Sequence, residues 1–133
     1  MGQMANGILY GVEAPELPTP AGWEEGDDSP AYDLILRWEN AQGISWGTPG
    51  PKVRHEAEGG KELIGVWVAC GGSGEDGAPY FMDEAMRLAD VERVYAKAIA
   101  RAAKLWKRFA SWAKKEGVTL PEPTLWLTPC EVA

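Results

Sequence analysis

The sequence has little of what export signals and membrane spans are made of. No apolar run approaches the roughly 20 residues that a transmembrane helix needs, which excludes a membrane span. The N-terminal stretch MGQMANGILYG lacks the basic segment and apolar core of a secretory signal. We therefore expect a cytoplasmic protein that does not bind membranes.

Cysteine and histidine are also scarce, since the chain has two cysteines, Cys70 and Cys130, and one histidine, His55. Neither cysteine belongs to a C-x-x-C pair or a zinc-type cluster, so we expect no metal and no cofactor. Without an export signal, the cysteines are expected to be free thiols in the core of a protein from a reducing compartment. Because the number of cysteines is even, a disulfide between Cys70 and Cys130 is the alternative.

The sequence contains no arrangement typical of nucleophilic catalysis. A catalytic triad would depend on His55, and no G-x-S-x-G elbow supplies a serine. A packed or surface histidine is the simpler interpretation, because the hairpin proposed below sets His55 opposite Ile64. Composition cannot select a catalytic pair among 20 carboxylates. We predict no catalytic residue, and the pattern favours a protein that is not an enzyme.

Charge is distributed unevenly along the 133 residues. Residues 1–89 contain 15 acidic and five basic side chains, a net charge of −10. Residues 90–116 contain eight basic and three acidic side chains, or +5, and the whole chain carries −7. Such a field disfavours direct nucleic-acid binding by the whole chain and favours a partner with a basic surface.

Three stretches in the first half of the chain predict strands. Residues 7–12 form a short apolar run, and residues 44–47 form another beside a turn. Apolar and polar side chains alternate over residues 31–38, which is typical of a half-buried strand.

A hairpin is the strongest local prediction. Gly59 and Gly60 suit a type I′ turn, which sets Val53 opposite Val66. The second strand of this hairpin, residues 63–70, is apolar on both faces apart from one glycine, and is therefore expected at the centre of a sheet.

The second half of the chain predicts a long amphipathic helix over residues 84–116. Asp83 is a plausible N-cap and Gly117 a plausible stop. Because the helix is longer than the strands, it either breaks near Asp90 or leaves a free part that packs on a partner. Residues 124–128, between prolines, predict a short final edge strand.

Together these elements predict one domain over residues 1–133, of the α+β class. We expect two layers, an antiparallel sheet of about four to six strands covered by the one long C-terminal helix. The basic residues of that helix surround an apolar stripe, a pattern also seen in helices that bind membranes or nucleic acids. The favoured interpretation is a core-packing helix whose basic face finds counter-charges within the acidic molecule.

An acidic, proline-rich loop over residues 13–30 offers the clearest interaction surface. Its six acidic side chains have no local base, and exposed aromatics among acids often anchor protein interfaces. The residues expected to contact a basic partner are Trp23, Glu24, Glu25, Asp27, Asp28 and Trp46.

The stretch ACGGSGEDGAPY places Gly72, Gly74 and Gly77 at the spacing G-x-G-x-x-G. A phosphate cradle is disfavoured, because Glu75 and Asp76 would repel a phosphate and a proline intervenes before the helix. The stretch is interpreted as a flexible joint between the central strand and the helix. If a ligand binds this stretch, we expect a cation or a basic side chain. The residues that would contact it are Gly72, Gly74, Glu75, Asp76 and Gly77.

The leading functional hypothesis is a small acidic interaction module. It would mask a basic surface of a partner that handles nucleic acids, as inhibitors and immunity-type proteins do, and it could self-associate through the 84–116 helix. The alternative is a small-ligand binding or catalytic domain, with a pocket between sheet and helix and the 71–77 glycine loop as its lid.

Overall fold

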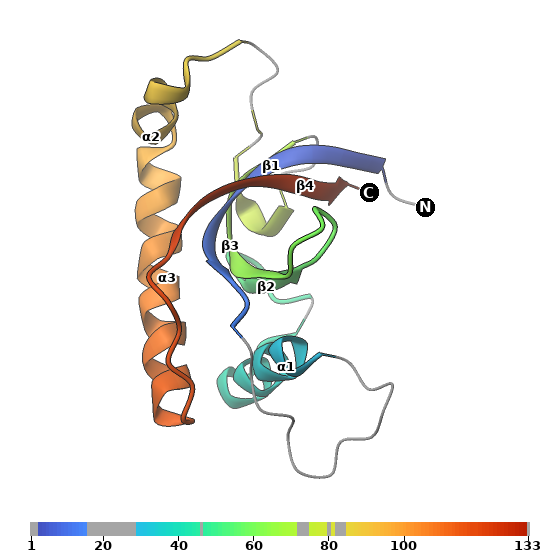
Figure 1. Cartoon of the computed structure of the whole chain (residues 1–133), viewed down its shortest axis with the longest axis vertical. Coiled ribbons are helices and arrows are strands. Elements are labelled where there is room, and N and C mark those ends of the chain that lie inside the picture. Colours follow the sequence, from blue (N-terminus) through green and yellow to red (C-terminus); the bar gives the residue numbers. More distant parts are fainter. Residues whose placement is uncertain are drawn as a thin grey trace.

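A computed structural model describes residues 3–15, 29–45, 47–71, 75–79, 81 and 85–132. Within these residues four strands form one antiparallel sheet in the order β2-β3-β1-β4. The strands are β1 (Gln3–Glu13), β2 (Val53–Glu56), β3 (Leu63–Cys70) and β4 (Thr124–Val132). With a long C-terminal helix beside the sheet, the predicted α+β class is confirmed (Figure 1).

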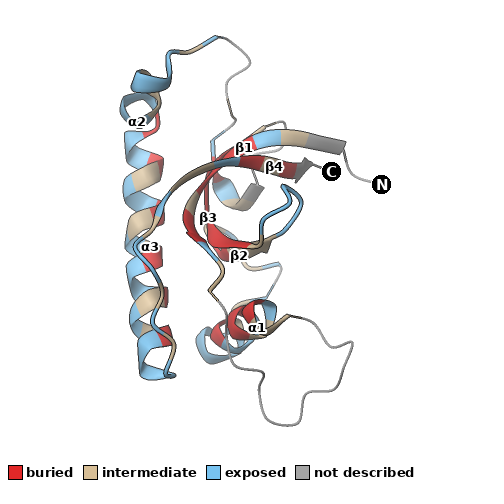
Figure 2. Cartoon of the chain, viewed as in Figure 1, coloured by how far each residue is buried: buried red, intermediate tan, exposed pale blue. Residues whose placement is uncertain are grey.

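The hairpin of β2 and β3 has the predicted register. Val53 lies opposite Val66 and His55 opposite Ile64. The turn differs from the prediction, because Gly60 has a positive φ of 83° and Gly59 does not, which excludes the type I′ conformation. Every residue of β3 is buried, as expected for a strand between two neighbours (Figure 2).

Residues 31–38 are helical, so the predicted strand there is wrong. Helix α1 (Pro30–Gln42) begins after Ser29, whose side-chain oxygen accepts a hydrogen bond from the Tyr32 amide at 3.2 Å. It ends at Gly43, which adopts the left-handed conformation. The short strand predicted over residues 44–47 is also wrong for its described residues, which form no strand.

The long helix is broken where it passes the end of the sheet. A 3-10 turn, η2 (Leu88–Asp90), leads into α2 (Val91–Val94), and Tyr95 separates α2 from α3 (Ala96–Lys115) with φ −102° and ψ 21°. The break therefore falls near the predicted position, and the upper part of the helix extends past the sheet (Figure 1). Asp90 precedes α2 without a side-chain cap, and the predicted N-cap Asp83 lies outside the described residues.

The main core lies between the sheet and the two helices α1 and α3. It joins Ile64, Val66 and Val68 of β3 to Trp38 of α1 and Phe109 of α3. The rings of Trp38 and Phe109 meet edge to face with centroids 5.5 Å apart. The prediction of a single covering helix thus missed α1. No helix in the described ranges combines the length and apolarity that crossing a bilayer needs.

A disulfide joins β3 to β4 across the strand that separates them. Cys70 and Cys130 are bonded with their α-carbons 6.2 Å apart, so the expected free thiols are not found. Both strands pair with β1, where Gly7 lies opposite Cys70 and Ala5 lies opposite Cys130. A β-carbon at Gly7 would lie 3.2 Å from the Cys130 β-carbon and 2.7 Å from the Trp67 ring. The missing side chain therefore makes room for the bridge.

Candidate binding surfaces

Most of the site residues predicted from the sequence lie outside the described residues. These are Trp23, Glu24, Glu25, Asp27, Asp28, Trp46, Gly72 and Gly74. The structure describes the backbone of Glu75 and the whole of Asp76 and Gly77, which form the 3-10 turn η1 (Glu75–Gly77).

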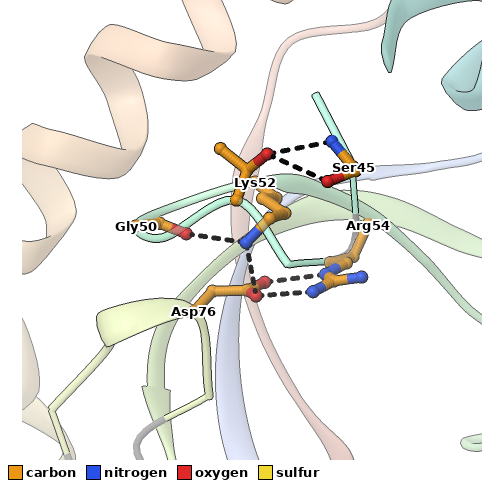
Figure 3. Close-up of polar contacts among 6 residues, drawn as sticks. Ser45, Gly50, Lys52, Arg54 and Asp76 are labelled. Atoms are coloured by element: carbon orange, nitrogen blue, oxygen red, sulfur yellow. Dashed lines mark hydrogen bonds and ion pairs between the residues drawn. The ribbon is translucent and has the colours of Figure 1, made fainter. Parts of the chain in front are cut away.

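Asp76 is held by two basic side chains of the sheet edge. Arg54 of β2 donates from Nε to Oδ2 at 2.7 Å and from Nη2 to Oδ1 at 2.6 Å (Figure 3). The ammonium of Lys52 lies 3.6 Å from Oδ1 and also donates to the Gly50 carbonyl at 3.3 Å. The side chains of Lys52 and Asp76 are only 5% and 4% exposed. This carboxylate is therefore a buried, neutralised part of the fold.

The backbone around Asp76 is fixed to the sheet as well. Asp76 has a left-handed φ of 54°, which aspartate tolerates better than most residues. The Cys70 amide donates to the Pro79 carbonyl at 3.0 Å, and the Phe81 amide donates to the Cys70 carbonyl at 3.2 Å. Arg101 of α3 donates to the Gly77 carbonyl at 3.1 Å. The described part of the predicted flexible joint is therefore anchored by these three hydrogen bonds and by the ion pair of Asp76.

A second carboxyl group, Glu56, lies on the same side of β2 as Arg54. Burial raises the pKa of Glu56 to about 7, while a hydrogen bond from Trp67 and the charge of Arg54 act in the opposite direction. A pKa near neutrality can mark a catalytic acid or base. Here the carboxyl lies beside the buried ion pair of Asp76 and Arg54, and its hydrogen bond from Trp67 joins it to the central strand. We assign Glu56 a structural role.

His55 packs against α1, on the opposite side of β2. Its ring meets that of Tyr32 edge to face with centroids 5.8 Å apart. Its Nε2 lies 3.2 Å from Glu62 Oε1, within ion-pair distance, but without the geometry of a hydrogen bond. The arrangement is that of a packed histidine, in agreement with the sequence-based interpretation.

A groove of about 910 Å³ lies where the helix extends past the sheet. It is bordered by β4 and β1 on one side and by η2, α2 and Tyr95, the residue before α3, on the other. Its lining is almost entirely apolar, and Glu92 is the one charged residue among those described. The lining residues are Ile8, Phe81, Met86, Leu88, Ala89, Val91, Glu92, Tyr95, Leu125, Trp126 and Leu127.

The rim of this apolar groove carries the two most exposed large apolar side chains of the described residues. Leu88 is 87% exposed and Leu127 is 71% exposed. Strand β4 pairs only with β1 in the described sheet, so its other edge presents unpaired backbone groups beside the groove. A groove between sheet and helix was predicted, but η1 of the supposed lid does not line it.

A second groove, of about 530 Å³, lies between α1 and α3. Trp38 and Gln42 of α1 line it together with six residues of α3. Four basic side chains surround it and no acidic one does, among the described residues. The lining residues from α3 are Lys104, Lys107, Arg108, Ser111, Trp112 and Lys115. We call this surface the basic groove.

Comparison of the chain with protein-family models, with curated proteins and with solved structures gave no match.

The sequence did not predict which residues line either groove. The apolar groove combines β1, the segment around residues 81–95 and β4, which only the strand order brings together. The signal that pointed to it was the length of the 84–116 segment, too long for the sheet. The basic groove depends on α1, which the alternating pattern of residues 31–38 concealed.

Proposed function

We propose that the protein is a binding module whose apolar groove takes an extended segment of a partner protein. The single observation that carries this proposal is the position of Leu88 and Leu127, highly exposed on the rim of an apolar groove beside an open strand edge. Large exposed apolar patches on soluble proteins commonly mark interaction sites.

The edge of β4 supplies what strand addition needs. An extended peptide beside an edge strand forms main-chain hydrogen bonds, and its alternate side chains enter neighbouring pockets. Leu125 and Leu127 lie on the same side of β4, because successive side chains alternate, and both line the apolar groove. Alternate apolar side chains of an added strand would therefore meet the groove.

The volume and charge of the apolar groove narrow the class of partner. About 910 Å³ is at the upper end of the about 300–1,000 Å³ typical of ligand sites, enough for several side chains. Glu92 on the lining favours a lysine or arginine within or next to the apolar segment. The proposed ligand is thus an extended apolar segment with a basic residue.

Selection from a displayed peptide library tests this function, and binding of the selected peptide is then measured by fluorescence anisotropy. Leu127→Lys should weaken binding tenfold or more, since it places a charge on the groove rim. Leu36→Lys is the matched control, because Leu36 is an exposed leucine of α1 outside both grooves. Equal binding by both variants and wild type, or selection of no peptide, would overturn the proposal.

The acidic loop over residues 13–30 remains a second proposed interaction surface, supported by its sequence. Its acids and Trp23 would contact a basic surface of a partner, in the manner of an inhibitor of a nucleic-acid enzyme. Replacing Glu24, Glu25, Asp27 and Asp28 by their amides should abolish capture of basic host proteins at low salt. Unchanged capture would remove this proposal.

Self-association and location also stay proposals. The overhanging part of the helix, with Val94 exposed, would form the contact in a homo-oligomer, which analytical ultracentrifugation of wild type and Val94→Lys tests. The expected cytoplasmic location depends partly on the cysteines being free thiols. The disulfide removes this support, since disulfides persist mainly in oxidising compartments. Fractionation of the native host tests it.

A further inference from the structure

The basic groove between α1 and α3 has no role in the proposed function, and it shares no lining residue with the apolar groove. Its four basic side chains, Lys104, Lys107, Arg108 and Lys115, form no ion pair with any described acidic residue. Several basic residues elsewhere do form ion pairs, among them Lys52, Arg54 and Lys61. The counter-charges expected from the sequence are thus absent at this groove in the described structure.

The four basic residues follow one face of α3. Their spacings of three, four and seven residues are those of neighbouring positions on a helix surface. From Lys104 to Lys115 the helix rises about 16 Å at 1.5 Å per residue, which matches about five residues of an extended chain at 3.3 Å each. The four positive charges therefore extend along α3 over a distance that matches the length of a short extended peptide.

Aromatic and polar side chains complete the surface. Trp38 and Trp112 line the groove with their rings edge to face and centroids 5.5 Å apart. Trp38 is buried and Trp112 half-buried, so the tryptophan from α3 offers an accessible apolar contact. Gln42 and Ser111 add hydrogen-bonding groups at the edge. The groove can therefore contact both the carboxylates and the apolar atoms of a bound chain.

Two other anionic partners fit the surface less well. A membrane surface needs the apolar stripe of the helix, but in α3 that stripe, including Trp106 and Phe109, is buried in the core. A nucleic acid would extend beyond the groove over a molecule of net charge −7, which repels a long polyanion. A short acidic segment places its charges on the groove alone.

We propose that the basic groove binds an acidic segment of a partner protein, about five residues long and extended along α3. The carboxylates pair with Lys104, Lys107, Arg108 and Lys115, and an apolar side chain contacts Trp112. Salt screens these charge pairs, so binding should weaken as the salt concentration rises. Because the charged segment of the partner is short, it contacts the basic groove alone and binding stays specific.

Fluorescence anisotropy with a fluorescein-labelled hexaglutamate peptide tests this proposal, at about 50 mM and about 500 mM salt, a range over which screening removes exposed charge pairing. A hexaglutamine peptide, a single-stranded oligonucleotide of equal charge and phosphatidylserine vesicles are the alternative ligands. Hexaglutamate should bind at low salt, release at high salt, and bind more tightly than the other three. Tighter binding of the oligonucleotide or the vesicles would overturn the choice of partner.

Two triple variants with the same change of net charge locate the site. Lys104→Gln, Lys107→Gln and Arg108→Gln together should weaken hexaglutamate binding at least tenfold. Arg93→Gln, Lys97→Gln and Lys114→Gln together remove three α3-region cations outside the groove, and should weaken it less than threefold. Circular dichroism checks that both variants fold. Equal losses in the two variants, or no binding by wild type at low salt, would refute the proposal.

Discussion

Arg54 and Asp76 form a two-point ion pair that ties the turn after the central strand to the edge strand β2. The carboxylate is buried, and Lys52 contacts it from a second direction. The described part of the stretch predicted to be a flexible joint is therefore anchored through its acidic residue Asp76.

Removing the charge of Asp76 should destabilise the fold. Asp76→Asn keeps a residue that tolerates the left-handed conformation, but it leaves Lys52 buried without its counter-charge. We expect the free energy of unfolding to fall by about 3 kcal/mol in urea denaturation. Glu122→Gln, at an exposed acid, is the matched control and should change it by less than about 0.5 kcal/mol. Similar values for the two variants would show that the ion pair contributes little.

Glu56 should give the stability a particular dependence on pH. Its pKa is about 7 in the folded protein against the usual 4.5 of a glutamate, so the folded state binds the proton more tightly. The free energy of unfolding attributable to this group therefore falls as pH rises from about 4.5 to about 7, and stays level above that.

Replacing Glu56 by glutamine should remove this slope. At pH 8, Glu56→Gln should be more stable than wild type by at most about 3 kcal/mol, less where water screens the carboxylate, and at pH 4 the two should agree. Urea denaturation at several pH values measures it. Parallel pH profiles for wild type and variant would contradict the structural role given to Glu56.

The disulfide should contribute strongly to stability. It closes a loop with a sequence separation of 60 residues, for which chain entropy predicts about 4 kcal/mol. The double variant Cys70→Ala, Cys130→Ala should have a lower Tm that a reducing agent does not change, whereas the Tm of wild type should fall on reduction. Two titratable thiols in the unreduced, unfolded wild type would show instead that the bond is absent.

The helical assignment of α1 can be tested at its cap. Ser29→Ala removes the acceptor of the Tyr32 amide and should lower the free energy of unfolding by about 1 kcal/mol. Ser45→Ala removes a hydroxyl from an exposed turn and serves as the control. If residues 31–38 formed a strand, Ser29→Ala would cost no more than the control.

The fold was predictable where one periodicity alone fitted the sequence. The all-apolar run of β3 and the double glycine before it were sufficient for the hairpin register and the central position. Residues 31–38 fit two periodicities, because Ala31, Leu34, Ile35 and Trp38 also have helical spacing and are the residues buried in α1. Ser29, Pro30 and Gly43 are helix boundary signals that could have decided between them.

The candidate sites were less predictable, because their residues are distant in the sequence. Arg54 and Asp76 are 22 positions apart, and no local pattern pairs them. The disulfide depends on β3 and β4 both flanking β1, which the parity of two cysteines cannot reveal. The excess length of the helix predicted either a break near Asp90 or a free part, and the break is found at Tyr95, beside the apolar groove.

The most direct test of the proposed function is amide hydrogen exchange of the protein with and without the peptide selected for the apolar groove. An added strand should protect backbone amides of Thr124–Thr128 in β4, at the edge that faces away from β1, and leave those of α1 unchanged. Protection confined to the helices, with no change along β4, would contradict strand addition at this edge.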